Sequence, residues 1–560
     1  MKQNLLTRSS SRGRTALAIA VAGLVAGTPA RAALPRPDPD NGGITLPPGF
    51  RAVVVADDLG RLRFLTVADN GDVYVKTRED GIVALRDTNG DGKADVKETF
   101  GSGGGTGIAI RDGWLYHSSN SAVYRYKLTP GELVPKAEPQ TIVSGLPDKR
   151  QHNSKGFAFD EQGRLYVEVG SPSNAYGGEK DRQKGAKGED PTEFLKEHGG
   201  FWRFDPDKTN QTQADGFHFS TGHRHMFGVA WNPVSKALFA TMHGRDQLST
   251  VAPEHYTDED NAEKPAEEFH VIREGANFGW PFTYYDPVKK ARMVGPEYGG
   301  DNQKTAEPGE YPDPLVAFPA HWAPMQLAFY RAEQFPAKYR GGAFIAFHGS
   351  WNRAPKPQKG YNVTFVPFDD KGMPKGTHEA FAHGFPGVAE VAAPNDALYR
   401  PCGVAVGPDG SLYVSDSQKG RVWRIFYAGE KKAAVGPAGG SGRRPAPTKA
   451  ADAVARGAEL YQQACSVCHM PDGSGVPGLQ PGLLDSPVVA GSPSTLIRVL
   501  LHGPAKVLPR GRSRDAGNTM PSFEGLSDAE LAAVVNYVRQ TFAKKTASIT
   551  PSEVATLRKN

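Results

Sequence analysis

The stretch "GVAVGPDGSLYV", residues 403–414, contains two short runs of alternating apolar residues on either side of a Gly-Pro-Asp-Gly turn. A period of two around such a turn is typical of a β-hairpin. The same pattern of apolar strand, turn and second apolar strand recurs five more times. The other copies are "LTVADNGDVYV" (65–75), "GIAIRDGWLYH" (107–117), "GFAFDEQGRLYV" (156–167), "GVAWNPVSKALFA" (228–240) and "LAFYRAEQFPAKYRGGAFIA" (327–346).

Six copies of one hairpin in a single chain favour a β-propeller, in which each copy forms the inner hairpin of one blade. An irregular β-sandwich with coincidental hairpins is the alternative. The 560-residue chain contains 65 glycines and 45 prolines, which favours many short strands and turns over long helices. We therefore predict a multidomain protein with an all-β six-bladed propeller over residues 33–429, followed by a small all-α domain.

Polar residues of the kinds used in binding sites stand just before three of the copies. His152, Arg224 and Arg400 each lie three or four residues before the first glycine of a copy. Because the innermost strands of a propeller surround one axis, we expect these side chains to meet over one pocket. Converging arginines suggest a planar, polyanionic ligand. For each residue taken alone, an exposed loop charge is the alternative.

A second motif lies near the C-terminus, in "ACSVCHMPDG" (464–473). Cys465, Cys468 and His469 form C-x-x-C-H, the attachment signature of a c-type haem. We expect thioether bonds from the two cysteines to one covalent haem c, with His469 as the proximal iron ligand. A zinc site would need further Cys or His ligands at suitable spacing, and none is evident in the sequence.

The residues around this motif have helical periodicity and predict a cytochrome c domain over residues 451–545. The distal iron ligand is predicted to be Met520, in "NTMPSF", because it lies about fifty residues after the haem motif and before the last helix. Methionine ligation would raise the haem potential, which suits an electron acceptor. His502 is the rival, although its position suits a helix C-terminus. The Gly/Pro/Ala-rich residues 430–450 are predicted to be a flexible linker, and residues 546–560 a C-terminal tail.

The N-terminus is typical of an export signal. Residues 1–32 contain three arginines, then the apolar run "ALAIAVAGLVAG", then the small-x-small cleavage pattern that ends at Ala32. An uncleaved anchor is the alternative, but the run is too short to span a bilayer. We expect cleavage near Ala32, a periplasmic protein and no transmembrane anchor after cleavage. Haem attachment through C-x-x-C-H agrees with export.

Net charge and cysteine content argue against a nucleic-acid-binding protein and against a disulfide-stabilised one. The segment 1–32 carries five basic residues and no acidic one, which accounts for the whole formal net charge of +5. The mature chain is therefore close to neutral, and nothing indicates a nucleic-acid partner. The chain has three cysteines, two of them in the haem motif, so Cys402 is left alone and a disulfide framework is excluded.

The segment "DTNGDGKADVKE" (87–98) matches the spacing of a calcium loop, with Gly92 at the sixth position. A polar hairpin tip is the alternative, since the preceding residues are strand-like rather than helical. A structural Ca²⁺ is the prediction here. Its ligands would be Asp87, Asn89, Asp91, Asp95 and Glu98.

Taken together, these segments resemble the soluble quinoprotein sugar dehydrogenases, six-bladed propellers that bind pyrroloquinoline quinone (PQQ), and most closely their sorbosone and aldose dehydrogenase branch. The C-terminal part resembles a class I cytochrome c. The propeller resemblance rests on these segments: "HNSKGFAFDEQGRLYVEVGSPSN" (152–174), "GHRHMFGVAWNP" (222–233), "HGRDQL" (243–248), "EEFHVIREGANFGWPFTYYD" (267–286), "FHGSWNR" (347–353) and "YRPCGVAVGPDGSLYVSD" (399–416).

The resemblance implies roles for individual residues. His152 matches the base that takes the proton of the substrate hydroxyl while hydride passes to the quinone, and Arg224 matches the arginine at the quinone oxygens. Four further residues match contacts to the cofactor: His321, Asn352, Arg353 and Arg400. Two backbone carbonyls match those that hold Ca²⁺: Gly279 and Pro281. The chain departs from the family pattern at His225, where asparagine is common, and at Cys402, where a second arginine is common.

The favoured hypothesis is a periplasmic quinoprotein dehydrogenase that oxidises an aldose or a sorbosone-like sugar aldehyde with PQQ. It would pass the electrons to its own haem and then to a downstream periplasmic or membrane acceptor. A calcium-dependent lactonase propeller is a second hypothesis, but it leaves the haem unexplained. A non-catalytic propeller that docks the cytochrome is a third, but it leaves the shared register of His152, Arg224 and Arg400 unexplained.

Overall fold

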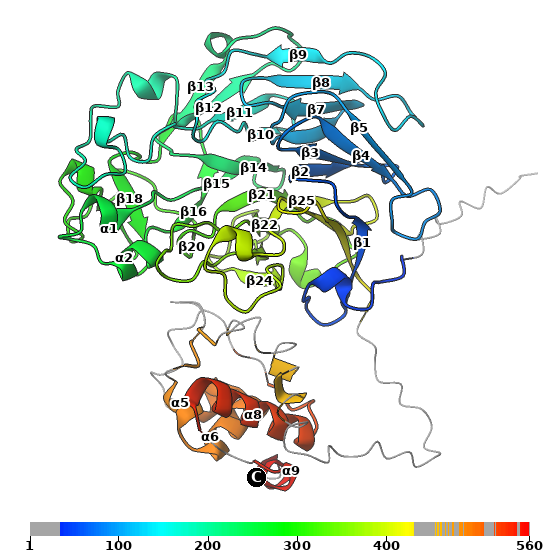
Figure 1. Ribbon diagram of the computed structural model, residues 1–560, viewed down its shortest axis with the longest axis vertical. Coiled ribbons are helices and arrows are strands. Elements are labelled where there is room, and N and C mark those ends of the chain that lie inside the picture. The colour runs from blue at the N-terminus through cyan, green and yellow to red at the C-terminus, as the bar shows by residue number, and fades with distance from the viewer. Residues whose placement is uncertain are drawn as a thin grey trace, which may run out of the picture. The chain divides into compact units, whose positions relative to one another are not determined.

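The protein is seen here as a computed structural model (Figure 1). The predicted export signal, residues 1–32, and the predicted linker, residues 430–450, lie outside the described residues. No helix in the described part is long and apolar enough to cross a bilayer. The described residues are 34–429, 454, 456–458, 460–461, 465, 469, 473–474, 481–484, 486–508, 520, 522–545 and 549–558.

Residues 50–427 form six sheets, each with four antiparallel strands, and the sheets follow one another as the blades of a ring (Figure 1). Each hairpin predicted from the sequence is the first pair of strands in one blade. The first strands contact one another around the centre in five of the six pairs of neighbouring blades. The predicted six-bladed propeller is therefore confirmed, and the β-sandwich alternative is wrong.

The strands of the first three blades are β2 (Leu62–Val67), β3 (Val73–Thr77), β4 (Ile82–Arg86), β5 (Val96–Phe100); β6 (Ile108–Arg111), β7 (Trp114–Ser118), β8 (Val123–Lys127), β9 (Gln140–Val143); and β10 (Phe157–Phe159), β11 (Leu165–Val169), β12 (Gly200–Phe204), β13 (Phe217–Thr221), with β17 (Ala276–Asn277) added in parallel. Those of the last three are β14 (Met226–Asn232), β15 (Ala237–Met242), β16 (Glu267–Ile272), β20 (Val316–Phe318); β21 (Pro324–Phe329), β22 (Ala343–Phe347), β23 (Asn362–Val366), β24 (Glu379–Ala382); and β25 (Pro401–Val406), β26 (Leu412–Asp416), β27 (Val422–Tyr427), β1 (Phe50–Ala56). A further hairpin, β18 (Thr283–Asp286) and β19 (Ala291–Val294), and the short helices α1 (Leu248–Val251) and α2 (Asp258–Glu263) lie in connections.

The sixth blade joins the two ends of the propeller. Its outermost strand is β1, which pairs antiparallel with β27 from Phe50 opposite Tyr427 onward. Phe50 is buried and makes edge-to-face contacts with Phe335 and Phe381 of the fifth blade, at centroid distances of 4.7 and 5.0 Å. This closure was not predictable from the sequence, because β1 has no hairpin partner close to it in the chain.

The hairpin of residues 403–414 shows how local sequence forms the inner strands. Gly410 has a φ of 84°, in the left-handed region that favours glycine, and its N–H donates to the carbonyl of Gly407. The Asp409 carboxylate accepts from the N–H of Ser411 at 3.1 Å and from Arg424 of β27 at 2.9 Å. The turn residues therefore satisfy their own polar groups, and the apolar strands on both sides are left to pack.

Bulges near the start of the innermost strands direct the preceding residues toward the face of the propeller at which these strands begin. Such bulges bend a strand locally and re-aim side chains. In four blades the pairing of the first two strands shifts register at this place: between Leu62 and Leu65, Met226 and Gly228, Pro324 and Leu327, and Pro401 and Gly403.

Gln326 connects three innermost strands across the centre. Its side-chain oxygen accepts from the backbone N–H of Leu65 at 3.0 Å and of Val404 at 3.1 Å. Its amide nitrogen donates to the carbonyl of Leu65 at 2.9 Å. One side chain of β21 thus satisfies backbone groups of β2 and β25 and holds the first, fifth and sixth blades together.

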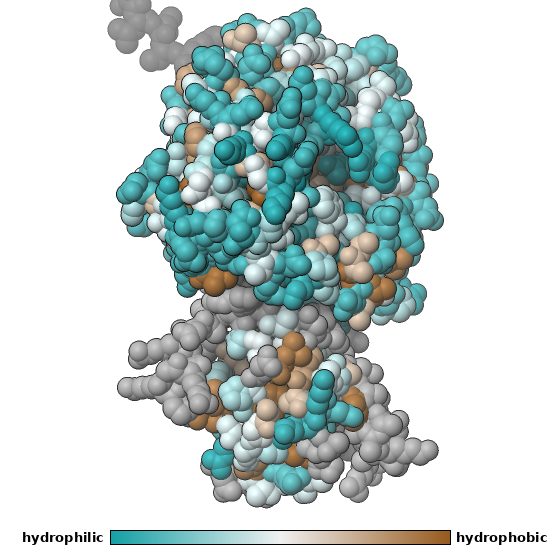
Figure 2. Space-filling view, turned by 60° about the vertical axis from the view of Figure 1, so that its left-hand side comes forward, coloured by the Kyte–Doolittle hydropathy of each residue, from teal (hydrophilic) through white to brown (hydrophobic). Residues whose placement is uncertain are grey.

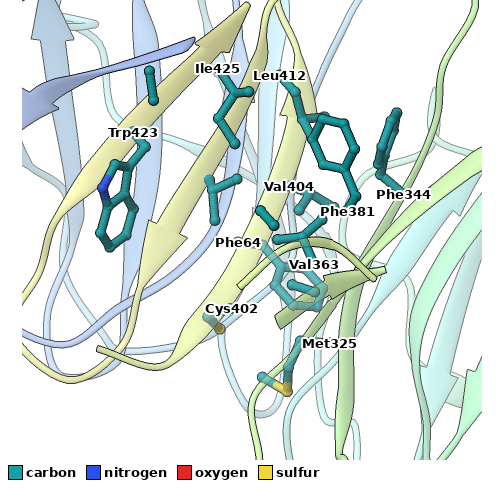
Figure 3. Packing of buried hydrophobic residues seen from close by; sticks show 14 of the residues in the cluster. Phe64, Met325, Phe344, Val363, Phe381, Cys402, Val404, Leu412, Trp423 and Ile425 are labelled. Carbon is teal, nitrogen blue, oxygen red and sulfur yellow. The ribbon is translucent and has the colours of Figure 1, made fainter. Parts of the chain in front are cut away.

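Cys402 lies in the largest apolar cluster, with Phe64, Met325 and Val404 among its members (Figure 3). It is fully buried, and burial raises the pKa of its thiol to about 11. A buried, protonated thiol behaves as a small apolar side chain. Cys402 therefore departs from the family pattern without introducing a reactive thiol.

The described C-terminal residues form helices α5 (Pro487–Ala490), α6 (Pro493–His502), α7 (Pro504–Val507), α8 (Asp528–Ala543) and α9 (Pro551–Arg558). Ile497 and Leu501 of α6 and Leu531 and Val535 of α8 are buried together in an apolar cluster of their own. The helix α8 begins with a capping box, in which Ser527 and Glu530 exchange hydrogen bonds with each other's backbone. The predicted all-α domain is confirmed.

Helix α9 corrects the prediction of a C-terminal tail over residues 546–560. Val554 is fully buried in the cluster of α6 and α8. The Asn536 side chain on α8 donates to the carbonyl of Ile549 at 2.9 Å and accepts from its N–H at 2.7 Å. Arg558 donates to the Asp528 carboxylate at 2.7 Å. The last turns are therefore a packed part of the domain.

Candidate functional site

A cavity of about 560 Å³ lies where the innermost strands of the third, fourth and fifth blades begin. Its volume is within the range of small-molecule sites. Four of the residues singled out in the sequence line it: His152, Arg224, His321 and Asn352. The shared register of His152 and Arg224 ahead of two innermost strands does bring them to one place.

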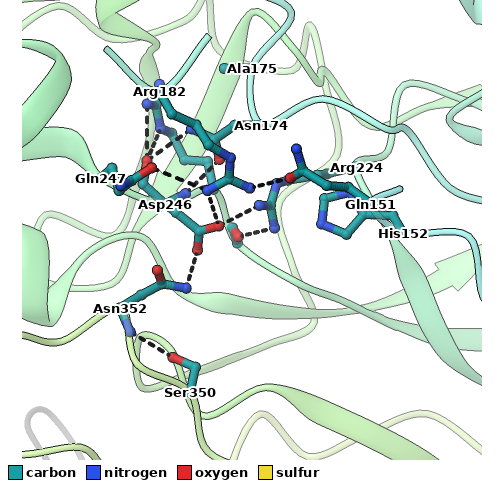
Figure 4. Close-up of polar contacts among 12 residues, drawn as sticks. Gln151, His152, Asn174, Ala175, Arg182, Arg224, Asp246, Gln247, Ser350 and Asn352 are labelled. Carbon is teal, nitrogen blue, oxygen red and sulfur yellow. Dashed lines mark hydrogen bonds and ion pairs between the residues drawn. The ribbon is translucent and has the colours of Figure 1, made fainter. Parts of the chain in front are cut away.

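A buried carboxylate, Asp246, organises the cavity (Figure 4). It forms ion pairs with Arg224 at 2.5 Å and Arg182 at 2.9 Å, and it accepts from the Asn352 amide at 2.6 Å. Burial alone raises the pKa of Asp246, but the charges of Arg224 and Arg182 outweigh it and lower the pKa to about 2. Asp246 is therefore ionised, and two guanidinium groups share its single negative charge.

His152 is positioned as a neutral base. Its Nδ1 is hydrogen-bonded to the carbonyl of Ser171, so Nδ1 carries the proton and Nε2 is left as an acceptor. Burial, and then the charge of Arg224, lower the pKa of His152 well below its usual value. The imidazole is thus unprotonated at neutral pH, which is the form that a general base requires.

His225 supports the ring of His152 from behind. The two imidazole rings stack with centroids 5.0 Å apart. Nδ1 of His225 lies 3.1 Å from the buried Glu168 carboxyl, which also accepts from the N–H of Met226 at 3.1 Å. Burial raises the pKa of Glu168 to about 8. The histidine that replaces the family's asparagine therefore packs against the predicted base.

Two arginines assigned to the cofactor by resemblance are engaged elsewhere. Arg353 is buried and donates to Glu263 of α2 at 2.5 Å. Arg400 donates to Nδ1 of His348 and to the carbonyl of Gly349, both at 2.8 Å. Neither arginine lines the cavity. Arg353 is buried and Arg400 is partly buried, and both guanidinium groups find their hydrogen-bond partners outside the cavity lining.

The carbonyls assigned to Ca²⁺ are not brought to the cavity. The carbonyl of Gly279 accepts from the Thr283 backbone N–H at 2.9 Å and from its hydroxyl at 3.2 Å. Neither Gly279 nor Pro281 lines the cavity. The structure therefore does not bring these two carbonyls to the cavity, and the cofactor calcium stays a prediction.

The predicted calcium loop is the tip of the hairpin between β4 and β5, which favours the alternative of a polar turn. The Asp87 carboxylate accepts from the N–H groups of Gly90 and Gly92, at 2.7 and 2.8 Å, and Glu98 is exposed on β5 opposite Ala84. In the described part of the chain, no three His, Cys, Asp or Glu side chains gather as a metal site. The structure therefore gives no support to a calcium site made by the five predicted ligands: Asp87, Asn89, Asp91, Asp95 and Glu98.

The cavity has the charge to hold a polyanion such as PQQ, which carries three carboxylates. Two buried atoms there, Nε of Arg224 and Oδ1 of Asn352, have no hydrogen-bond partner among the described residues. Arg150 and Arg182 also line the cavity. Burial raises the pKa of the lining residue Glu267 to about 8, so the arginines outnumber the ionised carboxylates at neutral pH. A ligand with carboxylates would balance this excess charge.

Sequence reasoning missed the residues that hold the site together. Asp246 lies in "HGRDQL", one of the segments on which the resemblance rests, so the segment was a signal although the residue was not singled out. Arg182 comes from the irregular connection between β11 and β12 and donates to Gln151, beside His152, at 2.8 Å. No pattern in that connection indicates a site residue.

The described residues of the haem motif have surroundings that suit a covalent haem c. His469 is buried, and its Nδ1 donates to the carbonyl of Pro481 at 2.8 Å, which leaves Nε2 for the iron. Cys465 and Met520 both pack against the apolar cluster of α6 and α8. Cys468 lies outside the described residues. The three predicted haem-binding residues that the structure describes are Cys465, His469 and Met520. Their surroundings agree with the haem prediction.

Replacing Met520 with alanine is expected to abolish the weak near-infrared band of sulfur-to-iron charge transfer, because this band requires a thioether on the distal face of the haem. His502, the rival ligand, ends α6 and is exposed. The matched control His502→Ala should keep the band. Absorbance spectroscopy of the oxidised protein decides, and a surviving band in Met520→Ala would overturn the assignment.

Arg558→Ala is expected to destabilise the haem domain by about 1–2 kcal/mol, allowing for its partial exposure. The side chain donates to the carbonyls of Glu524 and Leu526, both at 2.6 Å, and it pairs with Asp528. Denaturant unfolding followed by haem absorbance measures the change. Arg498→Ala, at an exposed arginine of α6, is the control, and equal midpoints for the two variants would refute the expectation.

Two known protein families together match nearly the whole described chain. The family described as TrAA12-like matches residues 44–428, and the family described as Cytochrome c matches residues 454–542. An uncharacterized protein of Borreliella burgdorferi is 28% identical over 207 residues, which is 37% of this chain and 48% of that protein. The cytochrome c subunit of a quinone alcohol dehydrogenase of Gluconobacter oxydans is 37% identical over 105 residues, 18% of this chain and 22% of that protein. The chain thus spans about half or less of the length of these two relatives.

Solved structures share the propeller fold. The calcium structure of the Trichoderma reesei carbohydrate-active enzyme of family AA12 has a TM-score of 0.56 at 18% identity, and the match covers 69% of this chain and 97% of that one. The holo form of the pyranose dehydrogenase PQQ domain of Coprinopsis cinerea has a TM-score of 0.53 at 19% identity, covering 70% and 98%. At these identities the likeness shows a common fold.

Proposed function

Because this chain belongs to the TrAA12-like family over residues 44–428 and carries a cytochrome c domain, we propose that it is a quinoprotein dehydrogenase that oxidises an aldose or sugar aldehyde and passes the electrons to its own haem. The observation that carries the proposal is a neutral base, His152, in an arginine-lined cavity of a chain that also contains a haem domain. The sugar-dehydrogenase resemblance and the pyranose dehydrogenase of similar fold support the choice of substrate class.

The chain's own residues would bind and orient the reactants. Arg224 would donate to the quinone oxygens of the cofactor and Arg182 to its carboxylates, and Asp246 holds both guanidinium groups in place. Asn352 offers an unpartnered carbonyl oxygen. PQQ, when bound, supplies the two-electron acceptor of the oxidation. No part of the reaction is assigned to Ca²⁺, because Gly279 and Pro281 do not lie at the cavity.

His152 would take the proton of the substrate hydroxyl at Nε2. The carbonyl of Ser171 holds the proton on Nδ1, and the stacked ring of His225 limits rotation of the imidazole. Removing this proton increases electron density on the hydroxyl oxygen and favours loss of hydride from the adjacent carbon.

The cytochrome c domain would be the first electron acceptor. A second domain in the same chain reaches an effective concentration in the millimolar range. Ligation by His469 and Met520 would raise the haem potential and make it a suitable acceptor. We further propose that the mature protein is periplasmic, which rests on the export-like residues 1–32 and on the haem motif, and that a periplasmic or membrane acceptor reoxidises the haem.

Reconstitution tests the proposal. The protein prepared without PQQ would be assayed for reduction of an artificial dye with a panel of aldoses, after addition of PQQ with and without Ca²⁺. Dye reduction that depends on both PQQ and an aldose is the expected result. The absence of PQQ-dependent reduction with every aldose would refute the dehydrogenase and leave a binding role for the propeller.

A further inference from the structure

An exposed indole stands at the mouth of the cavity. Trp351 is 54% exposed, and among the exposed large apolar residues of the described part it alone lines the cavity. The face of the propeller that Figure 2 shows is mainly hydrophilic, with apolar residues among the polar ones. Exposed apolar side chains at a concave site mark ligand contacts, whereas isolated ones on a convex surface need no explanation.

The turn that carries Trp351 is anchored by the two residues that follow it. Asn352 donates to Asp246 in the cavity at 2.6 Å, and its backbone carbonyl accepts from Asn261 at 2.8 Å (Figure 4). Arg353 is buried and pairs with Glu263 of α2 at 2.5 Å. Arg353 therefore points away from the cavity. Its pair with Glu263 fixes the backbone that carries the indole of Trp351.

The chemistry of the rim suits a cyclic sugar. A pyranose ring has an apolar face of C–H groups, which can pack on an indole, and hydroxyls around its edge, which need hydrogen-bond partners. Around the cavity, Arg150, Gln151 and Ser350 supply such polar groups. A short-chain aldehyde has no ring face to stack and would gain little from the indole.

From these observations we propose that Trp351 is a stacking platform for the pyranose ring of the substrate and selects cyclic saccharides over short-chain aldehydes. The inference rests on the proposed dehydrogenase function and names the substrate feature that its site recognises. In this role Trp351 contacts the sugar and does not contact the cofactor.

The kinetic test compares Trp351→Ala and Trp351→Phe in the holoenzyme, with Phe217→Ala as the control. Phe217 is also an exposed aromatic residue, 44% exposed on β13, and does not line the cavity. In Trp351→Ala, the ratio of kcat/KM for glucose to kcat/KM for glyceraldehyde should fall about tenfold, the scale of one lost aromatic contact. Trp351→Phe should recover part of it, and Phe217→Ala should not change it. An unchanged ratio in Trp351→Ala would overturn the inference.

A binding measurement separates this inference from the dehydrogenase proposal. Calorimetry of the PQQ-loaded chain with 1,5-anhydroglucitol, a pyranose without the anomeric hydroxyl, needs no turnover. The Kd should rise about tenfold in Trp351→Ala alone, and this result would support the platform even if no aldose were oxidised. If Trp351→Ala instead weakened PQQ binding as much as binding of the analogue, the residue would be a cofactor contact and the inference would be wrong.

Discussion

Replacement of His152 by alanine is expected to lower turnover at least about a hundredfold, the usual scale for loss of a general base, and to leave PQQ affinity nearly intact. The reason is geometric. The carbonyl of Ser171 holds the proton of His152 on Nδ1, and Nε2 is the acceptor. The ion pairs that fix Arg224 and Arg182 do not involve His152, so the cofactor contacts should survive its loss.

Turnover of the PQQ-loaded variant and the Kd for PQQ are the two measurements. The exposed His255 provides a control, since His255→Ala removes an imidazole without touching the cavity. Equal losses of cofactor affinity and turnover in His152→Ala would make His152 a cofactor anchor instead of a base.

The same assignment has a consequence for pH dependence. Burial and the charge of Arg224 lower the pKa of His152, so the base form persists below the usual histidine range. The wild-type kcat/KM should therefore fall only as the pH drops below about 6.5, the ordinary value for histidine. A fall centred above this value would show that another group limits the rate.

The double variant Cys465→Ala, Cys468→Ala is expected to lose electron transfer to a downstream cytochrome completely, while the propeller still reduces an artificial dye. Both cysteines are needed to hold the haem covalently, and without it the chain has no one-electron carrier. The reduced cofactor holds two electrons and one haem accepts one, so the haem must be reoxidised between two transfers. Dye reduction and reduction of an added cytochrome c, measured in parallel, test this.

Stopped-flow kinetics of the wild-type protein tests whether transfer occurs within one chain. When sugar is added, the rate of haem reduction should be independent of protein concentration, because donor and acceptor are covalently joined. A rate that increases in proportion to protein concentration would show transfer between molecules and would refute the relay within the chain.

Much of the fold was predictable from local patterns. Each inner hairpin, such as residues 403–414, combines alternating apolar residues with turn residues that bond to one another, as Asp409 does with Ser411. The haem motif was equally clear, since three residues of fixed spacing make the attachment site. The closure of the sixth blade by β1 and the packing of α9 on α8 were not predictable, because their partners are far away in the chain or follow no regular pattern.

The cavity shows most clearly how far the sequence alone could predict the site. Position before an innermost strand was enough to identify His152 and Arg224, because a propeller places equivalent positions around one axis. Arg400 and Arg353 do not line the cavity, because the folded chain directs these arginines to His348 and to Glu263, and their assignment to the cofactor stays a prediction. The orientation of a charged side chain depends on which partner lies within reach after folding, and that partner follows no spacing rule.

Amino-acid order alone therefore specified the blades, the helical haem domain and the residue types available for redox chemistry, since these depend on contacts between neighbours in the chain. Folding was needed to specify the site itself. His152, Asp246 and Asn352 come from separate blades, and the ion pairs of Asp246 set both the position of Arg224 and the charge of the cavity. The ion pairs of Asp246 depend on the fold, which buries these groups together, because water screens the same charges in an open chain.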